Sequence, residues 1–322
     1  MVPPNSPSSQ QLEHIVRSAT LAPSSHNTQP WLFSVRGQSI ELIADRRRAL
    51  PVNDPLDREL AISCGAALFN LRVAAAADGY ATEVVLKPDP GQPDLLARLS
   101  VRTAPALEPE AAFSRVIAQR RTYRRRYLAQ PVAEHVVRAL ADAARVEGAR
   151  LEPLRTETAR QAAATLVSEG DAVQWADPSW RRELAVWMHP RRCGDGLAIP
   201  VHGAALAQAV VRTFDMGRGV AARDRELADG SPLLTVLGTR DDSELDWLVA
   251  GQALQRALLT GVTHGLQASF LNQPIQVSSL RPRLAALAPE AGVPQLLLRW
   301  GRPIEEVPAS PRRVLAEVIE SD

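Results

Sequence analysis

Residues 21–33 read LAPSSHNTQPWLF. This segment follows an amphipathic helix expected over residues 9–21 and runs directly into a predicted strand. Two prolines bracket a run of small hydrogen-bonding side chains, and a tryptophan closes it. Such a loop is stiff and rich in donors and acceptors, so we expect it to hold a flat polar ligand by its edge. The alternative is an ordinary turn between helix and strand, which Pro, Ser and Asn also form.

Composition limits the classes of protein that the chain can belong to. Its 322 residues allow one large or two moderate domains, and 45% hydrophobic with 23% charged residues is typical of a globular protein. A net charge of +1 provides no overall field for nucleic acid or a membrane surface. Cys64 and Cys193 lack the spacing of a metal-ligand pair, so no metal site is expected. We expect a soluble cytoplasmic protein without a nucleic-acid or membrane partner.

Periodicity and turn residues predict helices and strands in two successive passes. The first pass has a hairpin of residues 31–36 and 39–44, a long helix over 57–78 and a strand over 82–86. The second pass has helices at 110–119, from Pro131 and at 245–264, with strands at 149–155, 266–271 and 295–300.

The two passes resemble copies of each other. Three residues of the first pass recur 186 positions later, since Gly65, Leu68 and Gly79 match Gly251, Leu254 and Gly265. We therefore expect an α+β fold duplicated in tandem, with mixed, mostly antiparallel sheets flanked by helices and the long helices packed together as a pseudo-dimer. The halves would span 1–105 and 106–322, with a lid-like insertion at about 157–244. The alternative is coincidence between two alanine-rich helices.

The copies differ in their polar residues. The first contains the Ser/Asn/Gln loop, whereas the corresponding segment of the second, AARVEGARLEP at 143–153, lacks these side chains. The first has no arginine cluster before its helix, whereas the second does. Two half-sites, each retained in one copy, predict one complete site per chain.

The arginine cluster, RRTYRRR at residues 120–126, is the densest basic run. A guanidinium group donates paired, charge-assisted hydrogen bonds to phosphate. A helical turn would place Arg120 and Arg124 on one side, and Thr122 adds a hydroxyl. The alternatives are a solvated basic helix end, or an anion- or nucleic-acid-binding surface, which the near-neutral net charge opposes.

The loop at residues 23–31 resembles the P-S-S-x-N-x-Q-P-W segment of the nitroreductase superfamily, which lies against the isoalloxazine ring of FMN across a dimer interface. The resemblance implies a nitroreductase-like fold, with the cofactor bound by Pro23, Ser24, Ser25, Asn27 and Gln29. His26 is the candidate for a proton donor, although a hydrogen bond to the ring edge fits it as well.

Three further segments resemble the same superfamily. Arg120, Arg121, Thr122 and Arg124 resemble its R-x-S-x-R/K motif, which holds the phosphate, the ribityl chain and the N1/C2 edge of the ring. Arg312 matches the arginine of its C-terminal tail, although Ser310 stands where the family often has lysine. Asn272 and Gln273 match the strand end whose backbone N–H groups face flavin N5, without the family's glutamate.

The resemblance implies an FMN-dependent oxidoreductase that carries hydride from NADH or NADPH to a small-molecule acceptor, such as a nitro compound or quinone, by ping-pong kinetics. No convincing acid–base pair is visible. The insertion, with Trp175, Trp180 and Trp187, suggests a lid and resembles the Acg-like branch; core packing of these tryptophans is the alternative. A second hypothesis is a lidded flavin-binding or flavin-sequestering stress protein with little or no turnover. The chain itself would be monomeric or a weak homodimer.

Overall fold

The computed structural model describes residues 7–103, 109–190, 194–199 and 204–320. The expected boundary between the halves, at residues 105 and 106, lies outside these ranges, and so does Cys193.

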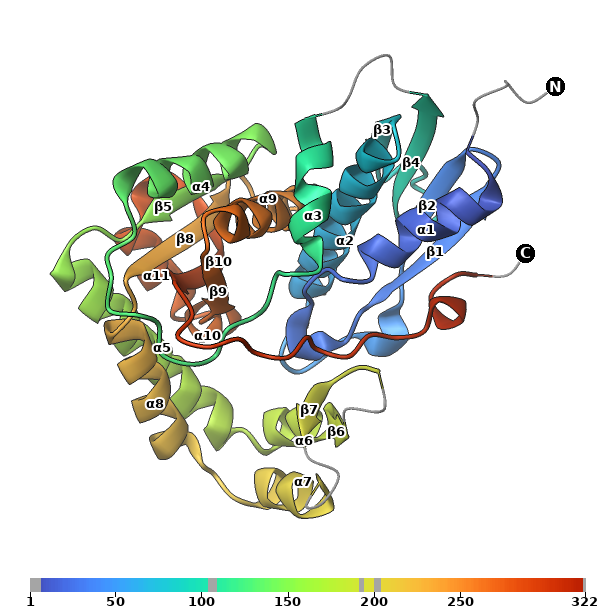
Figure 1. The fold of residues 1–322 in the computed structure, drawn as a ribbon. Helices are drawn as coiled ribbons and strands as arrows, with labels where there is room; N and C mark the ends of the chain where they lie inside the picture. Colours follow the sequence, from blue (N-terminus) through green and yellow to red (C-terminus); the bar gives the residue numbers. More distant parts are fainter. Residues whose placement is uncertain (1–6, 104–108, 191–193, 200–203, 321–322) are drawn as a thin grey trace.

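Two four-stranded antiparallel sheets share one topology (Figure 1). The first has the order β1-β2-β4-β3 and the second β5-β8-β10-β9. Their strands are β1 (Trp31–Arg36), β2 (Ser39–Ala44), β3 (Tyr80–Leu86), β4 (Leu95–Thr103), β5 (Arg150–Pro153), β8 (Leu233–Thr239), β9 (Gln267–Phe270) and β10 (Val293–Gly301). Each strand has a counterpart at the same place in the other sheet, as the predicted duplication requires. Strand β4 was missed in the sequence.

The two long central helices, α2 (Arg58–Ala77) and α9 (Glu244–Thr263), begin and end 186 positions apart. They cross where Gly65 meets Gly251. A Cβ atom added at Gly65 would lie 2.3 Å from the carbonyl oxygen of Leu248, and one added at Gly251 would lie 2.1 Å from that of Ile62. Leu248 is itself 186 positions after Ile62, so the contact is self-complementary like that of a two-fold dimer. The pseudo-dimer core is therefore confirmed.

Amphipathic helices cover the outer side of each half. Helix α1 (Ser9–Ala19), which is capped by Ser8, packs on the first sheet and α2, and α4 (Glu134–Val146) packs on the second sheet and α9. Among the described residues, α2 alone is long and apolar enough to cross a membrane, but 89% of that window is buried inside the protein. It is the core helix of the first half.

Two segments of the second half contact the first half. The expected helix 110–119 forms as η3 (Pro109–Phe113) and α3 (Ser114–Ile117), which pack on α2 before the chain reaches the second sheet through Tyr123, whose N–H donates to Ala268 at 2.8 Å. The C-terminal tail with η6 (Leu315–Glu317) lies along β1, where the N–H of Phe33 donates to Val318 at 2.7 Å. The second half thus contacts the first through both of its ends.

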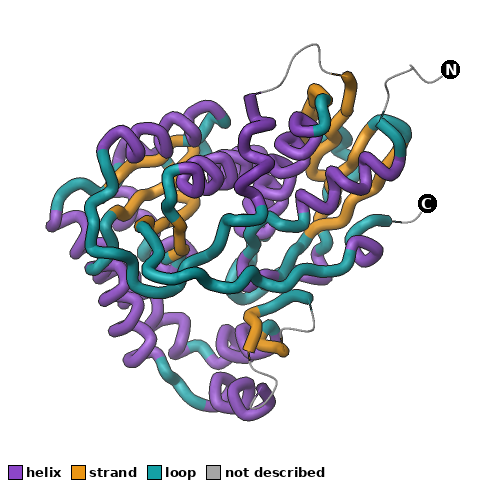
Figure 2. Tube along the Cα trace, in the orientation of Figure 1, coloured by secondary structure: helices purple, strands orange, loops and turns teal. Residues whose placement is uncertain are grey.

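The long insertion lies between β5 and β8, at the position that the Gly37-Gln38 turn occupies in the first half. It comprises α5 (Glu157–Ala176), α6 (Pro178–Val186), β6 (Met188–Pro190), β7 (Leu197–Ile199), α7 (Ala204–Thr213) and α8 (Gly217–Asp229). It is mostly helical and forms a layer beside the two halves (Figure 2). The predicted extent of 157–244 is too long, because β8 pairs with β5 and β10 and all seven of its residues are buried.

Other departures from the predicted elements are small. The helix expected from Pro131 begins at Glu134, and the strand at 149–155 covers only β5. Between β9 and β10 the chain forms α10 (Gln273–Gln276), α11 (Arg281–Leu287) and the turn η5 (Pro289–Ala291), and the first half adds η1 (Ser25–Asn27) and η2 (Arg46–Arg48).

We predict that Gly251→Ala destabilises the protein by about 3 kcal/mol, because the added methyl would meet backbone atoms that cannot move away singly. Gly219→Ala in α8 is the control, since an added Cβ there has no atom within 4 Å and should stabilise the helix by up to about 1 kcal/mol. Chemical denaturation measures both. Equal stability of Gly251→Ala and the wild type would contradict the close crossing of the helices.

Candidate functional site

A cavity of about 410 Å³ lies where the first half, the second half and the insertion meet. The first half contributes the start of the 21–33 loop and the first turns of α2. The second half contributes Arg124, Arg299 and the junction between β9 and α10, and the insertion contributes α5, α6 and α8. Its polar and aromatic lining includes Ser25, His26, Glu59, Arg124, Asp171, Trp175, Trp180, Asp224, Phe270, Asn272, Gln273, Gln276 and Arg299.

The 21–33 loop presents Pro23, Ser24, Ser25 and His26 to the cavity. Its backbone is unusual, because three non-glycine residues have positive φ: His26 at 48°, Asn27 at 55° and Gln29 at 51°. Each such residue costs of order 1 kcal/mol or more and persists only where its surroundings impose it. The backbone N–H of Gln29 donates to the hydroxyl of Ser24 at 2.9 Å.

Asn27 and Gln29 hold this loop in place and do not line the cavity. The Asn27 amide donates to Gly196 of the insertion and to Pro311 of the tail, at 3.3 and 3.2 Å. Gln29 is fully buried, donates to Gly194 at 2.9 Å and accepts from the N–H of Arg313 at 3.0 Å. The two side chains were predicted to contact a ligand directly, but they bond to the insertion and the tail and neither lines the cavity.

Two guanidinium groups, of the buried Arg120 and the half-buried Arg312, lie beside the same loop without a carboxylate partner among the described residues. Arg120 is 6% exposed, and its Nε and Nη1 have no hydrogen-bond acceptor. Arg312 donates to Asn27 Oδ1 at 3.0 Å and to the carbonyl oxygens of Leu21 and Ala22 at 3.2 and 3.1 Å, while its Nε is unpartnered.

These two cations also repel each other. Desolvation lowers the pKa of Arg120 to about 9, and the positive charges of Arg312, Arg121 and Arg124 add to this effect. Desolvation and Arg121 lower the pKa of Arg312 to about 10. Buried like charges with unsatisfied donors are unfavourable unless an anion joins them. The positive charge and the unpartnered donors of this arrangement suit an anion.

The basic run is extended, so the predicted helical turn is wrong. Thr122 forms a bridge with Ala268 of β9, and alternate residues of an extended chain share one side. Arg120 and Arg124 therefore still lie on the same side of the segment. Arg121 turns toward the tail, donating to the Val307 carbonyl at 3.3 Å.

Arg299 fixes the part of this run that carries Arg124. It is almost fully buried and donates to the carbonyl oxygens of Tyr123 and Arg125 at 2.9 and 3.0 Å. Arg124 is exposed and lines the cavity, and its guanidinium makes no hydrogen bond to a described residue. Desolvation and the nearby Arg299 lower its pKa. An anionic edge in the cavity would meet this group.

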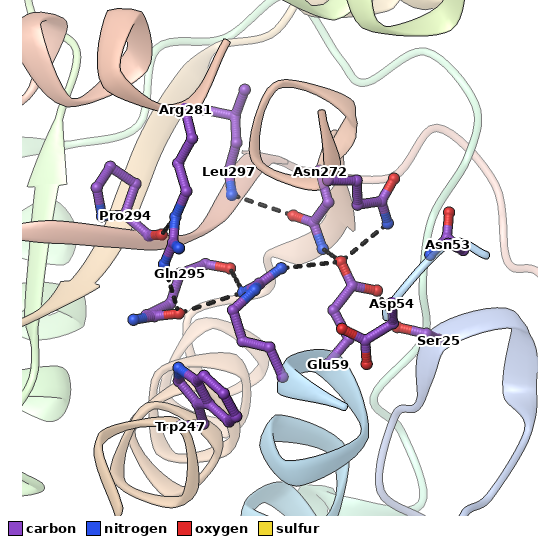
Figure 3. A network of polar contacts seen from close by, with 12 residues as sticks. Ser25, Asn53, Asp54, Glu59, Trp247, Asn272, Arg281, Pro294, Gln295 and Leu297 are labelled. Carbon is purple, nitrogen blue, oxygen red and sulfur yellow. Dashed lines mark hydrogen bonds and ion pairs between the residues drawn. The ribbon is translucent and has the colours of Figure 1, made fainter. Parts of the chain in front are cut away.

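Glu59 is the functional candidate that sequence reasoning missed. It is 3% exposed, in the first turn of α2, and its carboxylate accepts from Ser25, from Gln276 at 2.8 Å and from Asn272 at 3.5 Å (Figure 3). The signal was available, because Glu59 is the only acidic residue of a mostly apolar 20-residue helix. The strand end at Asn272 lacks the glutamate that the resemblance implies, but the carboxylate of Glu59, from the first half, lies close to it.

Asn272 and Gln273 lie at the junction between β9 and α10. Asn272 Oδ1 accepts from the backbone of Leu297 at 3.1 Å, and the Gln273 amide donates to Asp171 and Asp224 of the insertion at 3.1 and 3.0 Å. The insertion therefore contacts the junction directly. The two aspartates had no sequence signal that distinguished them from other acidic residues of the insertion.

The described tryptophans of the insertion serve two roles. Trp175 and Trp180 pack edge to face, 5.5 Å between ring centroids, in a small core of the insertion and also line the cavity. Trp180 Nε1 donates to Asn53 Oδ1 at 2.9 Å, which anchors α6 to the first half. Trp187 stacks on His189, and Arg48 lies over the Trp187 ring. Trp175 and Trp180 therefore both pack in the core of the insertion and line the cavity.

His26 is uncharged at neutral pH. Desolvation, opposed in part by Glu59, lowers the pKa of His26 to about 4, and its Nδ1 has no partner. A group with this pKa is a poor proton donor at pH 7. Its free nitrogen suits a hydrogen bond to a ligand.

We predict that His26 makes the protein sensitive to acid. In the unfolded chain His26 binds a proton below its ordinary pKa of 6.5, whereas in the folded protein it does so only near pH 4. The contribution of His26 to stability therefore falls as pH drops from 6.5 to 4, by at most about 3 kcal/mol. In His26→Gln the loss between pH 6.5 and 4 should shrink, measured by urea denaturation. His14→Gln, on the exposed side of α1, should retain it. Identical pH profiles for all three proteins would contradict the prediction.

Comparison with known proteins identifies the family. No protein-family model matches the chain. The Mycobacterium tuberculosis H37Rv protein named "Putative NAD(P)H nitroreductase Rv3131" is 32% identical over 98% of this chain and 92% of its own length. The protein of the same strain named "Putative NAD(P)H nitroreductase acg" is 29% identical over 95% and 94%. "Probable NAD(P)H nitroreductase PigM" of Serratia sp. is 25% identical over 96% and 93%.

Among solved structures, the FMN and NADPH-dependent nitroreductase NfnB from sphigopyxis sp. strain HMH is 19% identical, with a TM-score of 0.45 over 65% of this chain and 98% of that one. The family assignment rests on the sequence relatives, which match almost end to end. The chain belongs to the NAD(P)H nitroreductase family.

Proposed function

We propose that the cavity binds FMN and that the protein is an FMN-dependent NAD(P)H oxidoreductase acting on a nitro compound, a quinone or a similar small acceptor. The observation that carries the proposal is the pair of guanidinium groups of Arg120 and Arg312 beside the 21–33 loop, in which Arg120 Nε and Nη1 and Arg312 Nε are buried without a hydrogen-bond partner among the described residues. A phosphate monoester carries a charge of about −2 and accepts several hydrogen bonds. It would neutralise both cations at once.

The residues that line the cavity fit the ring and the rest of the cofactor. A volume of about 410 Å³ is in the usual range for a small-molecule site. Ile62, Leu254 and Phe270 offer apolar contact for a ring, and the free Nδ1 of His26 offers a hydrogen bond to its edge. Arg124 would meet the ring edge that becomes anionic on reduction. The backbone of Asn272 and Gln273 would lie at the N5 side, and Pro23, Ser24 and Ser25 against the ring.

Bound FMN supplies the hydride chemistry, and the protein supplies binding, orientation and electrostatics. The nicotinamide and the acceptor would use one cavity in turn, which gives ping-pong kinetics. We propose that α5 to α8 form a lid, because they complete one wall of the cavity and bind the 21–33 loop through Gly194 and Gly196.

We propose one flavin for each chain, bound between halves that divide near residues 105 and 106. In the second half, the segment equivalent to the loop closes as a tight turn at Gly148, and Glu147 there pairs with Arg72 and Arg256 at 2.6 and 2.7 Å. These charges are mutually satisfied and need no ligand. We further propose a cytoplasmic monomer or weak homodimer, as the internal pseudo-dimer already brings two halves together.

We predict that Arg124→Ala weakens FMN binding at least about tenfold, because a charge-assisted hydrogen bond contributes roughly 1.5–3 kcal/mol. Arg145→Ala is the matched control, since Arg145 lies exposed in the last turn of α4, at the start of the segment that corresponds to the loop, and within the described ranges its only ion pair is with Asp142. Fluorescence titration of the flavin-free protein measures both. Equal affinities of the two variants would contradict the proposal of one complete site.

Anaerobic mixing with NADH or NADPH tests the activity itself. The yellow flavin should bleach within seconds, and a quinone should restore the colour. If dithionite bleaches the flavin but neither nucleotide does, the protein is not a reductase, and the lidded flavin-sequestering hypothesis would take its place. A purified protein that never acquires a flavin spectrum would exclude both.

A further inference from the structure

The insertion contributes a pair of carboxylates to the cavity wall, Asp171 from α5 and Asp224 from α8. Both accept hydrogen bonds from the same amide nitrogen, Gln273 Nε2, at 3.1 and 3.0 Å. Helix α5 reaches this close because Gly170 has no side chain, and an added Cβ would lie 2.7 Å from Gln273 Cβ. The pair is therefore held against the junction proposed to lie at flavin N5.

Asp171 has one oxygen without a partner. The residue is 2% exposed and lines the cavity, and its Oδ2 is buried with no hydrogen-bond partner among the described residues. A buried carboxylate oxygen left unsatisfied is costly when it is ionised. A protonated Oδ2 facing the cavity could instead donate to a bound molecule.

The two aspartates have different electrostatic environments. Desolvation raises the pKa of Asp224, but the hydrogen bond from Gln273 and the charges of Arg223, Arg299 and Arg124 oppose that rise. Asp171 has no such cation among the groups that act on it. Desolvation and the charge of Asp224 raise the pKa of Asp171 to about 7. Two carboxylates whose surroundings separate their pKa values typically divide into an acid and an ion, with Asp171 here the acid.

The other charged groups packed around Asp171 are already engaged. On α5 itself, Glu169 pairs with Arg283 of α11, and from α6 Arg181 donates to the Trp175 carbonyl. Across the cavity stand Arg124, His26 and Glu59, and α10 presents the uncharged Gln273 and Gln276.

No other cavity group is equally suited to donate a proton at neutral pH. His26 is uncharged there. Glu59 already accepts hydrogen bonds from Ser25, Arg58 and Gln276. Among the described residues, Asp171 lines the cavity and keeps one carboxylate oxygen without a hydrogen-bond partner.

We propose that Asp171 donates the proton that accompanies hydride transfer to the acceptor, with Asp224 and Gln273 as positioning residues. This inference rests on the proposed reductase function. Reduction of a quinone to the hydroquinone requires one hydride and one proton. NAD(P)H supplies the hydride through the flavin, and the second O–H bond of the product forms as the O–H bond of Asp171 breaks. Solvent then reprotonates the Asp171 carboxylate, so the cycle consumes one NAD(P)H and one proton for each quinone.

The test separates proton donation from electron transfer. Holoenzyme is reduced with dithionite, so that reaction with NAD(P)H plays no part, and then mixed with a quinone or with ferricyanide, which accepts electrons without a proton. Asp171→Asn should slow oxidation by the quinone about 100-fold and leave ferricyanide oxidation within twofold. The wild-type quinone rate should fall above pH 7, and Asp224→Asn should move that fall to lower pH. Glu169→Gln, on the same helix, is the control.

A measurement without turnover supports the assignment independently. An aspartate with a raised pKa in the folded protein destabilises it as pH rises from about 4 to 7, because the unfolded chain has already lost the proton. The Tm of Asp171→Asn relative to the wild type should therefore increase across this range in flavin-free protein, and that of Glu169→Gln should not.

Two results would overturn the proposal. Equal quinone rates for Asp171→Asn and the wild type exclude Asp171 as donor, and equal slowing with ferricyanide shows a structural role only. Failure of the proposed function has a different signature, because NADH and NADPH would then leave the wild-type flavin oxidised whatever residue stands at 171.

Discussion

The crossing of α2 and α9 at two glycines is the constraint on which the rest of the structure depends. Neither Gly65 nor Gly251 can carry a Cβ atom without meeting backbone of the other helix. The contact therefore fixes both the distance between the halves and their rotation about the pseudo-two-fold axis. With the helices in this register, the loop before β1 in one half reaches the end of β9 in the other, and the cavity exists only because both arrive there.

Duplication within one chain allowed the two equivalent regions to diverge. One retains a strained loop, buried cations without anionic partners and a cavity. The other has a short turn at Gly148 and a closed network in which Glu147 and Glu110 pair with Arg72 and Arg256. Buried charges that are paired contribute to a fixed structure, whereas unpaired ones mark a place that a ligand completes. The charge pattern alone therefore distinguishes the binding region from its structural counterpart.

Sequence reasoning succeeded where a local pattern determines the structure. The hairpin around Gly37 and the bounds of α2 follow from alternation, apolar runs and turn residues. It failed where distant partners decide. Strand β8 is a short apolar run that periodicity cannot distinguish from a buried helix segment. Arg120 and Arg124 share one side in either a helical or an extended chain, and pairing with Ala268 of β9 selects the extended one. The orientation of Gln29 depends on Gly194 and Arg313, 165 and 284 positions away.

These same distant contacts join the insertion to the binding loop. The positive-φ backbone at Asn27 and Gln29 is held by Gly194 and Gly196 of the insertion and by the C-terminal tail. Arg312 donates hydrogen bonds both to Asn27 and to the carbonyl oxygen of Leu21, just after α1. An anion that engages Arg312 therefore acts on the residue that also contacts the insertion. Arg312 and the insertion thus meet at one strained turn, because both contact the side-chain amide of Asn27.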